Sequence, residues 1–140
     1  MAWRVLVVDD EVKYGALLQR VLERDGFDAT AVDNGEAATA LLLAGKVDLL
    51  VTDLQMPGLT GADLVELAAR LPHAPQMLVI TAQKGELEGT FKRIKGVHCL
   101  LKPFTLQDFR AKVGLLTGRW SATAAGIDSD LPRAQGAPTP

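Results

Sequence analysis

Five short apolar runs alternate along the chain with longer segments in which apolar residues recur at helical spacing. The runs cover residues 3–8, 28–32, 47–52, 77–80 and 97–101. Because most of these runs are apolar without strict alternation, they predict strands buried on both faces of a parallel sheet.

The segments between the runs carry the pattern of amphipathic helices. Leu18 and Leu22 share one face of the first helix, which Gly26 is expected to end. Later helices are predicted to open at Asn34, to span about 59–71 and 84–95, and to follow Thr105 as the N-cap. The helix at 84–95 is the softest, because each interior glycine, Gly85 and Gly89, costs roughly 0.5–1 kcal/mol relative to alanine.

Five strand–helix units in a row predict an α/β fold with a doubly wound, five-stranded parallel sheet. Right-handed crossovers place helices on both faces of such a sheet, and its sites lie beyond the carboxyl ends of the strands. From about residue 119, small residues, polar residues and prolines replace the apolar pattern. We therefore expect one domain over 1–118 and a disordered tail or linker over 119–140.

Composition narrows the classes of function. Of the 140 residues, 48% are hydrophobic, and the net charge of -2 offers no basic excess for a phosphate backbone. We expect no nucleic-acid binding by this chain alone. Cys99 is the single cysteine, which excludes an intramolecular disulfide and a cysteine-rich metal site. The first apolar run is too short for a signal peptide or a membrane span, so a cytoplasmic protein without membrane contact is expected.

The residues that follow four of the predicted strands form a chemically matched set. They are Asp9 with Asp10, Asp53, Thr81 and Lys102. Three close carboxylates repel one another, and oxygen ligands without His or Cys favour a hard cation such as Mg²⁺ or Ca²⁺. A lysine and a hydroxyl beside that cation would bind an anion. The set therefore suits phosphoryl transfer to a carboxylate.

Each member of this set also has a simpler interpretation. Either acid after the first strand, or Glu11 beside them, could cap the first helix; the threonine could merely end its strand; the lysine could be a solvated surface charge. Asp53 is a poor helix cap, because residues 56–58 separate it from the next helix. The joint occurrence of all these residues, each after its own strand, outweighs the simpler interpretations.

Four motifs make the resemblance to a known family specific. They are VVDDE at 7–11, VTDLQMPGLTG at 51–61, ITA at 80–82 and LKPF at 101–104. In order and near spacing they resemble the signatures of receiver domains of bacterial two-component response regulators, over about residues 3–117. The resemblance implies the flavodoxin-like strand order 2-1-3-4-5.

The resemblance also implies a phosphoacceptor and a metal site. Asp53 would be the nucleophile that takes a phosphoryl group from a kinase phosphohistidine. Asp10 and Asp53 would ligate Mg²⁺ directly, together with the backbone carbonyl of Gln55. Asp9 would act through a metal-bound water.

Three further groups are implied to hold the phosphoryl oxygens. Lys102 would pair with Asp53 and then with one phosphoryl oxygen. The Thr81 hydroxyl and the backbone N–H of Ala82 would hold the others. The Lys102–Pro103 peptide bond would be cis.

Cys99 departs from the family pattern. It stands where most receivers have Tyr or Phe, an aromatic ring that moves when Thr81 moves. Cysteine lacks that bulk, so we expect phosphorylation to shift the segment from about 82 to 99 instead of flipping a ring. The simpler interpretation of Cys99 is a small buried residue in a strand; the alternative is a thiol redox sensor.

The function implied by the resemblance is a phosphorylation-activated signalling switch. Its partners would be a histidine kinase or phosphotransfer protein and a downstream protein target, and it would catalyse only its own phosphorylation and dephosphorylation. About 20 residues follow the last predicted helix, so we expect either a single-domain regulator or the receiver of a longer protein. A phosphorylation-dependent homodimer is left open.

Two other classes of protein share part of this pattern. A pseudo-receiver that only docks partners would usually have lost an acid or the lysine, and all are present here. A haloacid-dehalogenase-type phosphatase also uses an aspartyl nucleophile with Mg²⁺. It would require a second aspartate where Gln55 stands, and a nucleophile after the first sheet strand instead of the third.

Overall fold

The computed structural model describes residues 2–56, 58, 60–82, 94 and 96–118. The elements are β1 (Arg4–Val8), α1 (Val12–Arg24), β2 (Asp28–Val32), α2 (Gly35–Leu43), β3 (Leu49–Asp53), α3 (Gly61–Ala69), β4 (Gln76–Thr81), β5 (Val97–Leu101) and α5 (Leu106–Thr117). They confirm the predicted strands and helices with small shifts at the ends. The helix predicted at 84–95 lies outside the described residues, apart from residue 94.

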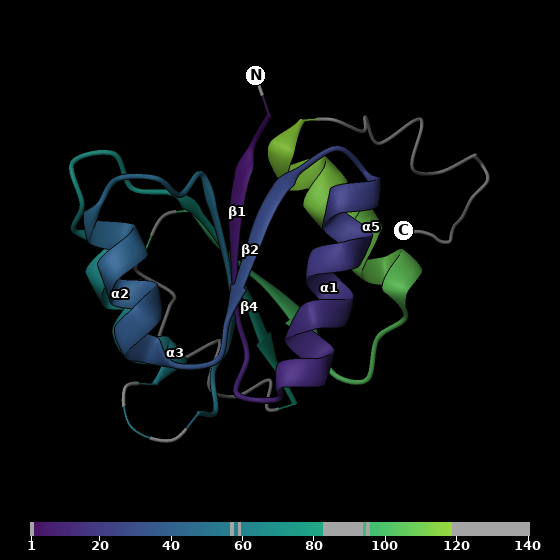
Figure 1. Ribbon diagram of the computed structural model, residues 1–140, viewed down its shortest axis with the longest axis horizontal. Helices are drawn as coiled ribbons and strands as arrows, with labels where there is room; N and C mark the ends of the chain where they lie inside the picture. Colours follow the sequence, from purple (N-terminus) through teal and green to yellow (C-terminus); the bar gives the residue numbers. More distant parts are fainter. Residues whose placement is uncertain (1, 57, 59, 83–93, 95, 119–140) are drawn as a thin grey trace. The chain divides into compact units, whose positions relative to one another are not determined.

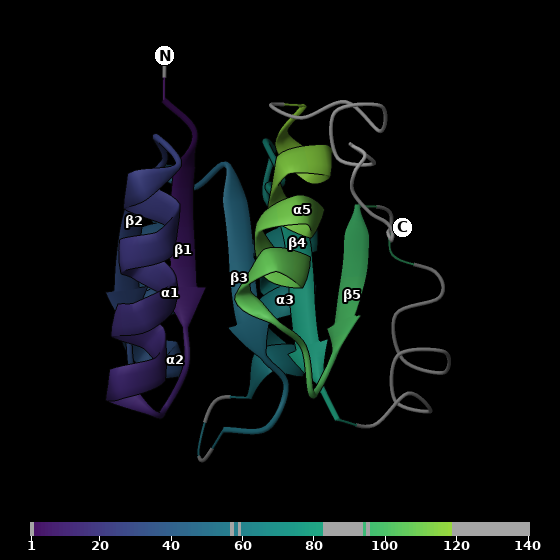
Figure 2. The same cartoon turned by 90° about the vertical axis from the view of Figure 1, so that its right-hand side faces the viewer.

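The strands form one parallel sheet in the order β2-β1-β3-β4-β5. This confirms both the predicted fold class and the strand order that the family resemblance implied. All five arrows point toward the same edge of the sheet (Figure 2). The carboxyl ends of the strands therefore meet there, and we call this side of the sheet the carboxyl edge and the opposite side the amino edge. Both are distinct from the two outer strands, β2 and β5.

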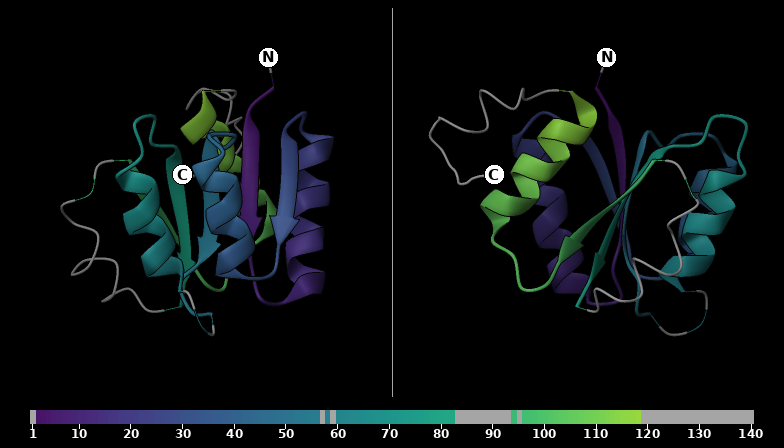
Figure 3. Two further views of the ribbon diagram at one scale, coloured as in Figure 1. Left: turned by 60° about the vertical axis from the view of Figure 1, so that its left-hand side comes forward. Right: turned by 180° about the vertical axis from the view of Figure 1, so that it is seen from behind.

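Helices cover both faces of the sheet. α1 lies over one face, and α2 and α3 lie side by side over the opposite face (Figures 1 and 3). Apolar side chains of three strands and two helices form the core beneath α2 and α3; they include Leu6, Val8, Leu50, Met77 and Val79 from the strands and Ala38, Leu42, Leu64, Val65 and Ala68 from the helices. Each large side chain of this kind contributes roughly 1.5–3 kcal/mol when it is fully buried.

The strands were predicted to be buried on both faces; this is confirmed for the inner strands β1, β3 and β4 but not for the outer strands β2 and β5. β3 and the last four residues of β1 are buried throughout, as is β4 after its first residue. β2 and β5 are only partly buried. The prediction of two-sided burial was wrong for these two, because an edge strand has a neighbouring strand on one side only.

By its internal contacts the chain divides into two compact units, Met1–Phe104 and Thr105–Pro140. The first contains the sheet with α1, α2 and α3. In the second, α5 begins at the predicted cap: the Thr105 side chain accepts a hydrogen bond from the Asp108 N–H at 3.0 Å, and Asp108 bonds back to the Thr105 N–H at 3.1 Å. The domain boundary predicted at residue 118 stays a prediction.

Candidate functional site

The carboxyl edge of the sheet collects the predicted site residues. In the strand register, Val8 lies beside Thr52, and Asp53 lies beside Ile80. Thr81 lies beside Leu101, the last residue before Lys102. Parallel pairing thus carries the ends of β1, β3, β4 and β5 to one place.

Asp53 and Lys102 meet directly at this edge. The Lys102 Nζ donates a hydrogen bond to Asp53 Oδ2 at 2.8 Å, and the Gln55 N–H donates to Asp53 Oδ1 at 2.9 Å. The Asp53 side chain is 9% exposed, whereas that of Lys102 is 38% exposed. Burial lowers the pKa of Lys102, but the hydrogen bond and charge of Asp53 outweigh it, so that the pKa is raised. The ammonium is therefore firmly charged beside a buried carboxylate.

Asp9 brings a second buried carboxylate to the site. It is 4% exposed, and its Oδ1 accepts a hydrogen bond from the Glu11 N–H at 2.9 Å. Burial raises the pKa of Asp9, and the negative charges of Asp53 and Asp10 raise it further. The bond from Glu11 and the charge of Lys102 oppose this rise. The carboxylates at the site therefore carry more negative charge than the single ammonium of Lys102 offsets.

The structure also shows whether these acids act as helix caps. The N-cap of α1 is Glu11, whose side chain makes no capping bond. The N-cap of α3 is Thr60, which forms a capping box with Asp63, so Asp53 is not a helix cap. Asp10 is exposed and lies between the end of β1 and the start of α1.

The remaining predicted groups lie around the same edge. Thr81 is buried at the end of β4, and its carbonyl accepts a hydrogen bond from the Lys102 N–H at 2.9 Å. Ala82, whose N–H was predicted to bind a phosphoryl oxygen, is exposed and follows directly. The Lys102–Pro103 bond is cis, as the resemblance implied.

The donor chemistry of this site fits Mg²⁺. The available ligands are carboxylate and carbonyl oxygens, and the charge on the buried Asp9 and Asp53 is what a divalent cation would relieve. Within the described residues, no three His, Cys, Asp or Glu side chains are close enough to form a metal cage. The predicted set does not require one, because Asp9 would act through water and Gln55 through its backbone.

The end of β3, which carries Asp53, is confined by α3. An added Cβ at Gly61 would overlap the Asp53 carbonyl oxygen and stand 2.8 Å from the Leu54 Cα. Only a residue without a side chain lets α3 start this close to the end of β3. The glycine in the sequence motif therefore has a steric reason.

Comparison with known proteins agrees with this geometry. A family model described as the response regulator receiver domain matches residues 5–114. The chain belongs to this family. Its members are signalling modules of two-component systems, not classical enzymes; they bind Mg²⁺ at their phosphorylation site and interact with histidine kinases and downstream effectors.

Individual relatives cover the receiver domain to different extents. The chemotaxis protein CheY of Pseudomonas aeruginosa is 35% identical over 116 residues, which are 79% of this chain and 92% of that protein. The transcriptional regulatory protein CpxR of Escherichia coli is 31% identical over 132 residues, which are 92% of this chain but 56% of that protein. The chain thus spans about half the length of the transcriptional regulators that it matches.

A solved structure shows the same fold. The response regulator protein TrrA of Thermotoga maritima, in complex with Mg²⁺ and BeF, has a TM-score of 0.72 at 26% identity. The match covers 81% of this chain and 98% of that chain. In the described part of this receiver domain, no helix is long and apolar enough to cross a membrane.

Cys99 is placed differently from the simpler prediction. It is exposed on β5, so the interpretation as a small buried residue was wrong. The reason is again the edge position of β5, which packs against one neighbouring strand. The predicted shift of the segment 82–99 falls largely on residues that the structure does not describe, and it stays a prediction.

Two aromatic residues near the site of this receiver domain were missed by the sequence reasoning. The rings of Tyr14 and Phe104 meet edge to face, with centroids 6.3 Å apart and an interplanar angle of 63°. Tyr14 is the only tyrosine and lies four residues after Asp10. That spacing, one helical turn after the acidic pair, was the available signal.

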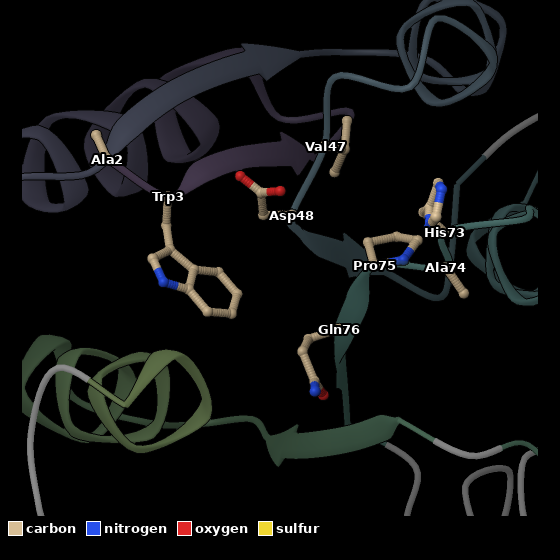
Figure 4. Close-up of a pocket in the computed structure, with 8 residues that line it drawn as sticks. All are labelled: Ala2, Trp3, Val47, Asp48, His73, Ala74, Pro75 and Gln76. Carbon is tan, nitrogen blue, oxygen red and sulfur yellow. The ribbon is translucent and has the colours of Figure 1, made fainter.

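The opposite edge of the sheet has a shallow hollow of about 440 Å³ (Figure 4). Its lining residues are Ala2, Trp3, Val47, Asp48, His73, Ala74, Pro75 and Gln76. These residues precede or begin β1, β3 and β4, so the hollow lies away from the carboxyl ends of the strands. None of the predicted site residues lines it.

Proposed function

We propose that Asp53 accepts a phosphoryl group from the phosphohistidine of a histidine kinase or phosphotransfer protein, in a Mg²⁺-dependent reaction. The phosphorylated chain then signals through contacts with a downstream protein, in the cytoplasm. The observation that carries this proposal is the 2.8 Å contact between Lys102 Nζ and the buried Asp53, with the second buried acid Asp9 beside it. A lysine held beside a buried carboxylate is also in position to bind the phosphoryl group that the transfer would leave there.

In the proposed transfer, an Asp53 carboxylate oxygen attacks phosphorus and the bond from phosphorus to the donor nitrogen breaks. The nitrogen keeps the electron pair, and an acyl phosphate remains on Asp53. The Gln55 N–H, which already bonds to Asp53 Oδ1, keeps the carboxylate oriented. Lys102 exchanges its contact with Asp53 for one with a phosphoryl oxygen.

The other groups bind what the transfer creates. The Thr81 hydroxyl and the Ala82 N–H would receive phosphoryl oxygens at the end of β4. Asp10, Asp53 and the Gln55 carbonyl would hold Mg²⁺ directly, and Asp9 would do so through water. When bound, the ion would neutralise charge on the phosphoryl oxygens.

The direct test uses acetyl phosphate with Mg²⁺ and measures intact mass. We expect the chain to gain the mass of one phosphoryl group, and to lose that gain when Mg²⁺ is chelated. Asp53→Asn should fold and stay unlabelled. A wild-type chain that is folded, binds Mg²⁺ and takes no label would instead indicate a module that only docks partners.

A further inference from the structure

Tyr14 is a residue for which the proposed transfer has no role, although it lies beside the site. It is the third residue of α1 and half-buried. Its ring meets the ring of Phe104 edge to face, with centroids 6.3 Å apart. Such an arrangement is the favoured geometry for two aromatic rings.

Phe104 ties this contact to the functional lysine. It stands two residues after Lys102, in the turn that leaves β5. The near end of that turn is fixed to the sheet by the Lys102 N–H, which donates to the Thr81 carbonyl at 2.9 Å. The contact of Phe104 with Tyr14 fixes the far end against α1. The backbone that carries Lys102 is thus held on both sides.

The charged groups of the site also influence the Tyr14 hydroxyl. Burial raises the pKa of Tyr14; Lys102 opposes this rise, whereas Asp9, Asp53 and Glu11 add to it. Together with the ring contact to Phe104, these charges indicate that Tyr14 lies next to the turn that carries Lys102.

The lysine needs such support. Its side chain is 38% exposed, and a long, partly solvated lysine loses considerable rotamer freedom when it is held in one geometry. A turn that is free to move would let the ammonium leave Asp53 more often. A turn braced by two rings keeps the 2.8 Å contact populated.

We propose that Tyr14 is a positioning residue: its ring, packed edge-on against Phe104, holds the turn so that the Lys102 ammonium stays on Asp53. The inference rests on the proposed function for its consequence, since a displaced Lys102 would slow phosphoryl transfer. The contact itself exists without that function. The ring performs this role, and the hydroxyl is not required.

The first test measures the position of Lys102 without any phosphoryl transfer. The full chain is treated briefly with acetic anhydride, and acylation of Lys102 is compared by mass spectrometry with that of the exposed Lys46. Tyr14→Ala should raise the ratio of Lys102 to Lys46 labelling roughly 2- to 10-fold, as expected from loss of one aromatic pair. Tyr14→Phe should leave the ratio unchanged. Leu17→Ala, on the same helix, is the matched control.

The second test asks whether Tyr14 acts through Lys102. With acetyl phosphate and Mg²⁺, Tyr14→Ala should slow labelling of Asp53 by a similar factor, and Tyr14→Phe should restore the rate. In a Lys102→Ala background the Tyr14→Ala change should add nothing. Additive losses in that background, or equal losses for the phenylalanine and alanine variants, would overturn the proposal.

The outcomes distinguish a failure of the positioning role from a failure of the proposed function. If wild-type chain takes no label while Tyr14→Ala still raises Lys102 acylation, the proposed function fails and the positioning role stands. If the acylation ratio is unchanged in a folded Tyr14→Ala chain, the positioning role is refuted. Should that variant fail to fold, Phe104→Leu removes the same ring contact from the other side and decides in its place.

Discussion

Two pairs of a basic residue and an aspartate stand at opposite edges of one sheet. At the amino edge, Arg4 Nε and Nη2 bond to the Asp48 carboxylate, each at 3.1 Å, joining the start of β1 to the residue before β3. At the carboxyl edge, Lys102 and Asp53 join the residue after β5 to the end of β3. Both pairs thus connect segments that are distant in the chain, but their surroundings differ.

Burial separates the two pairs. Arg4 and Asp48 are 45% and 36% exposed, and Asp48 also accepts the Arg4 N–H at 2.8 Å, so that pair is fully bonded and screened by water. Asp53 is 9% exposed and has Asp9, another buried acid, as a neighbour. The first pair is a modest anchor. The second leaves negative charge unbalanced, which is costly for stability and useful for binding a cation and an anion.

The largest expected difference is in labelling. Asp53→Asn should abolish phosphorylation by acetyl phosphate with Mg²⁺, because the carboxylate nucleophile is gone. Asp48→Asn, the matched change at the amino edge, should be labelled like the wild type. Intact-mass measurement distinguishes them. Full labelling of folded Asp53→Asn would assign the phosphoacceptor to another residue. The functional difference between the two pairs would then be wrong.

Replacing each base should separate response from anchoring. Lys102→Ala should still bind Mg²⁺ but lose most of its spectral change on addition of beryllofluoride, because the phosphoryl-binding ammonium is absent. Arg4→Ala should keep that change. Two-dimensional amide NMR with and without beryllofluoride is the measurement. An unaltered response in Lys102→Ala would make Lys102 only a surface charge.

The start of α3 should also be sterically less tolerant than the first turn of α1. Gly61→Ala must push α3 away from the Asp53 carbonyl, and such overpacking costs roughly 1–3 kcal/mol of unfolding free energy. At Gly15 in α1, an added Cβ would stand 3.8 Å from the Asp9 Cβ, an ordinary contact. Gly15→Ala should therefore stabilise by up to about 1 kcal/mol through helix propensity. Urea unfolding of both variants measures the change in unfolding free energy. A stabilised Gly61→Ala or a destabilised Gly15→Ala would contradict the prediction.

Mg²⁺ should stabilise the fold through the carboxyl edge alone. With free Mg²⁺ at about ten times its Kd, mass action predicts a gain of about 1.4 kcal/mol. Asp10→Asn should lose most of this gain, and Asp48→Asn should retain it. Thermal melts with and without Mg²⁺ provide the measurement. A gain of equal size in Asp10→Asn would remove Asp10 from the metal site.

The smallest effect concerns pH at the amino edge. The hydrogen bond from Arg4 lowers the folded-state pKa of Asp48. A lowered pKa means that Asp48 stabilises the fold above its unfolded value of about 3.9, and that this contribution is lost as pH falls through the lower folded value. Asp48→Asn should thus be less stable than wild type at neutral pH, with the difference shrinking in acid. A difference that grows in acid would contradict the assignment.

Much of the architecture could be predicted because it depends on local pattern. Apolar runs identified the strands, and Asn34, Thr60 and Thr105 act as caps because their side chains accept from the next turn. Thr60 lay within the helix predicted at 59–71, so its cap role emerged only in the fold. Two-sided burial was predicted wrongly for β2 and β5, because that prediction used only the apolar pattern of each run and not the strand order that the resemblance implied.

The sequence alone determined that acids, a threonine and a lysine would follow successive strands, since the polarity and order of residues along the chain specify this directly. It was therefore sufficient to predict a site at the carboxyl edge. The resemblance implied that Lys102 pairs with Asp53, and the tertiary structure decided the 2.8 Å distance of that pair. It alone decided the closeness of Gly61 to the Asp53 backbone and the pairing of Tyr14 with Phe104. Two of these contacts, Lys102 with Asp53 and Tyr14 with Phe104, join residues far apart in the chain. The distances in all three depend on strand register and helix packing, which no local pattern encodes.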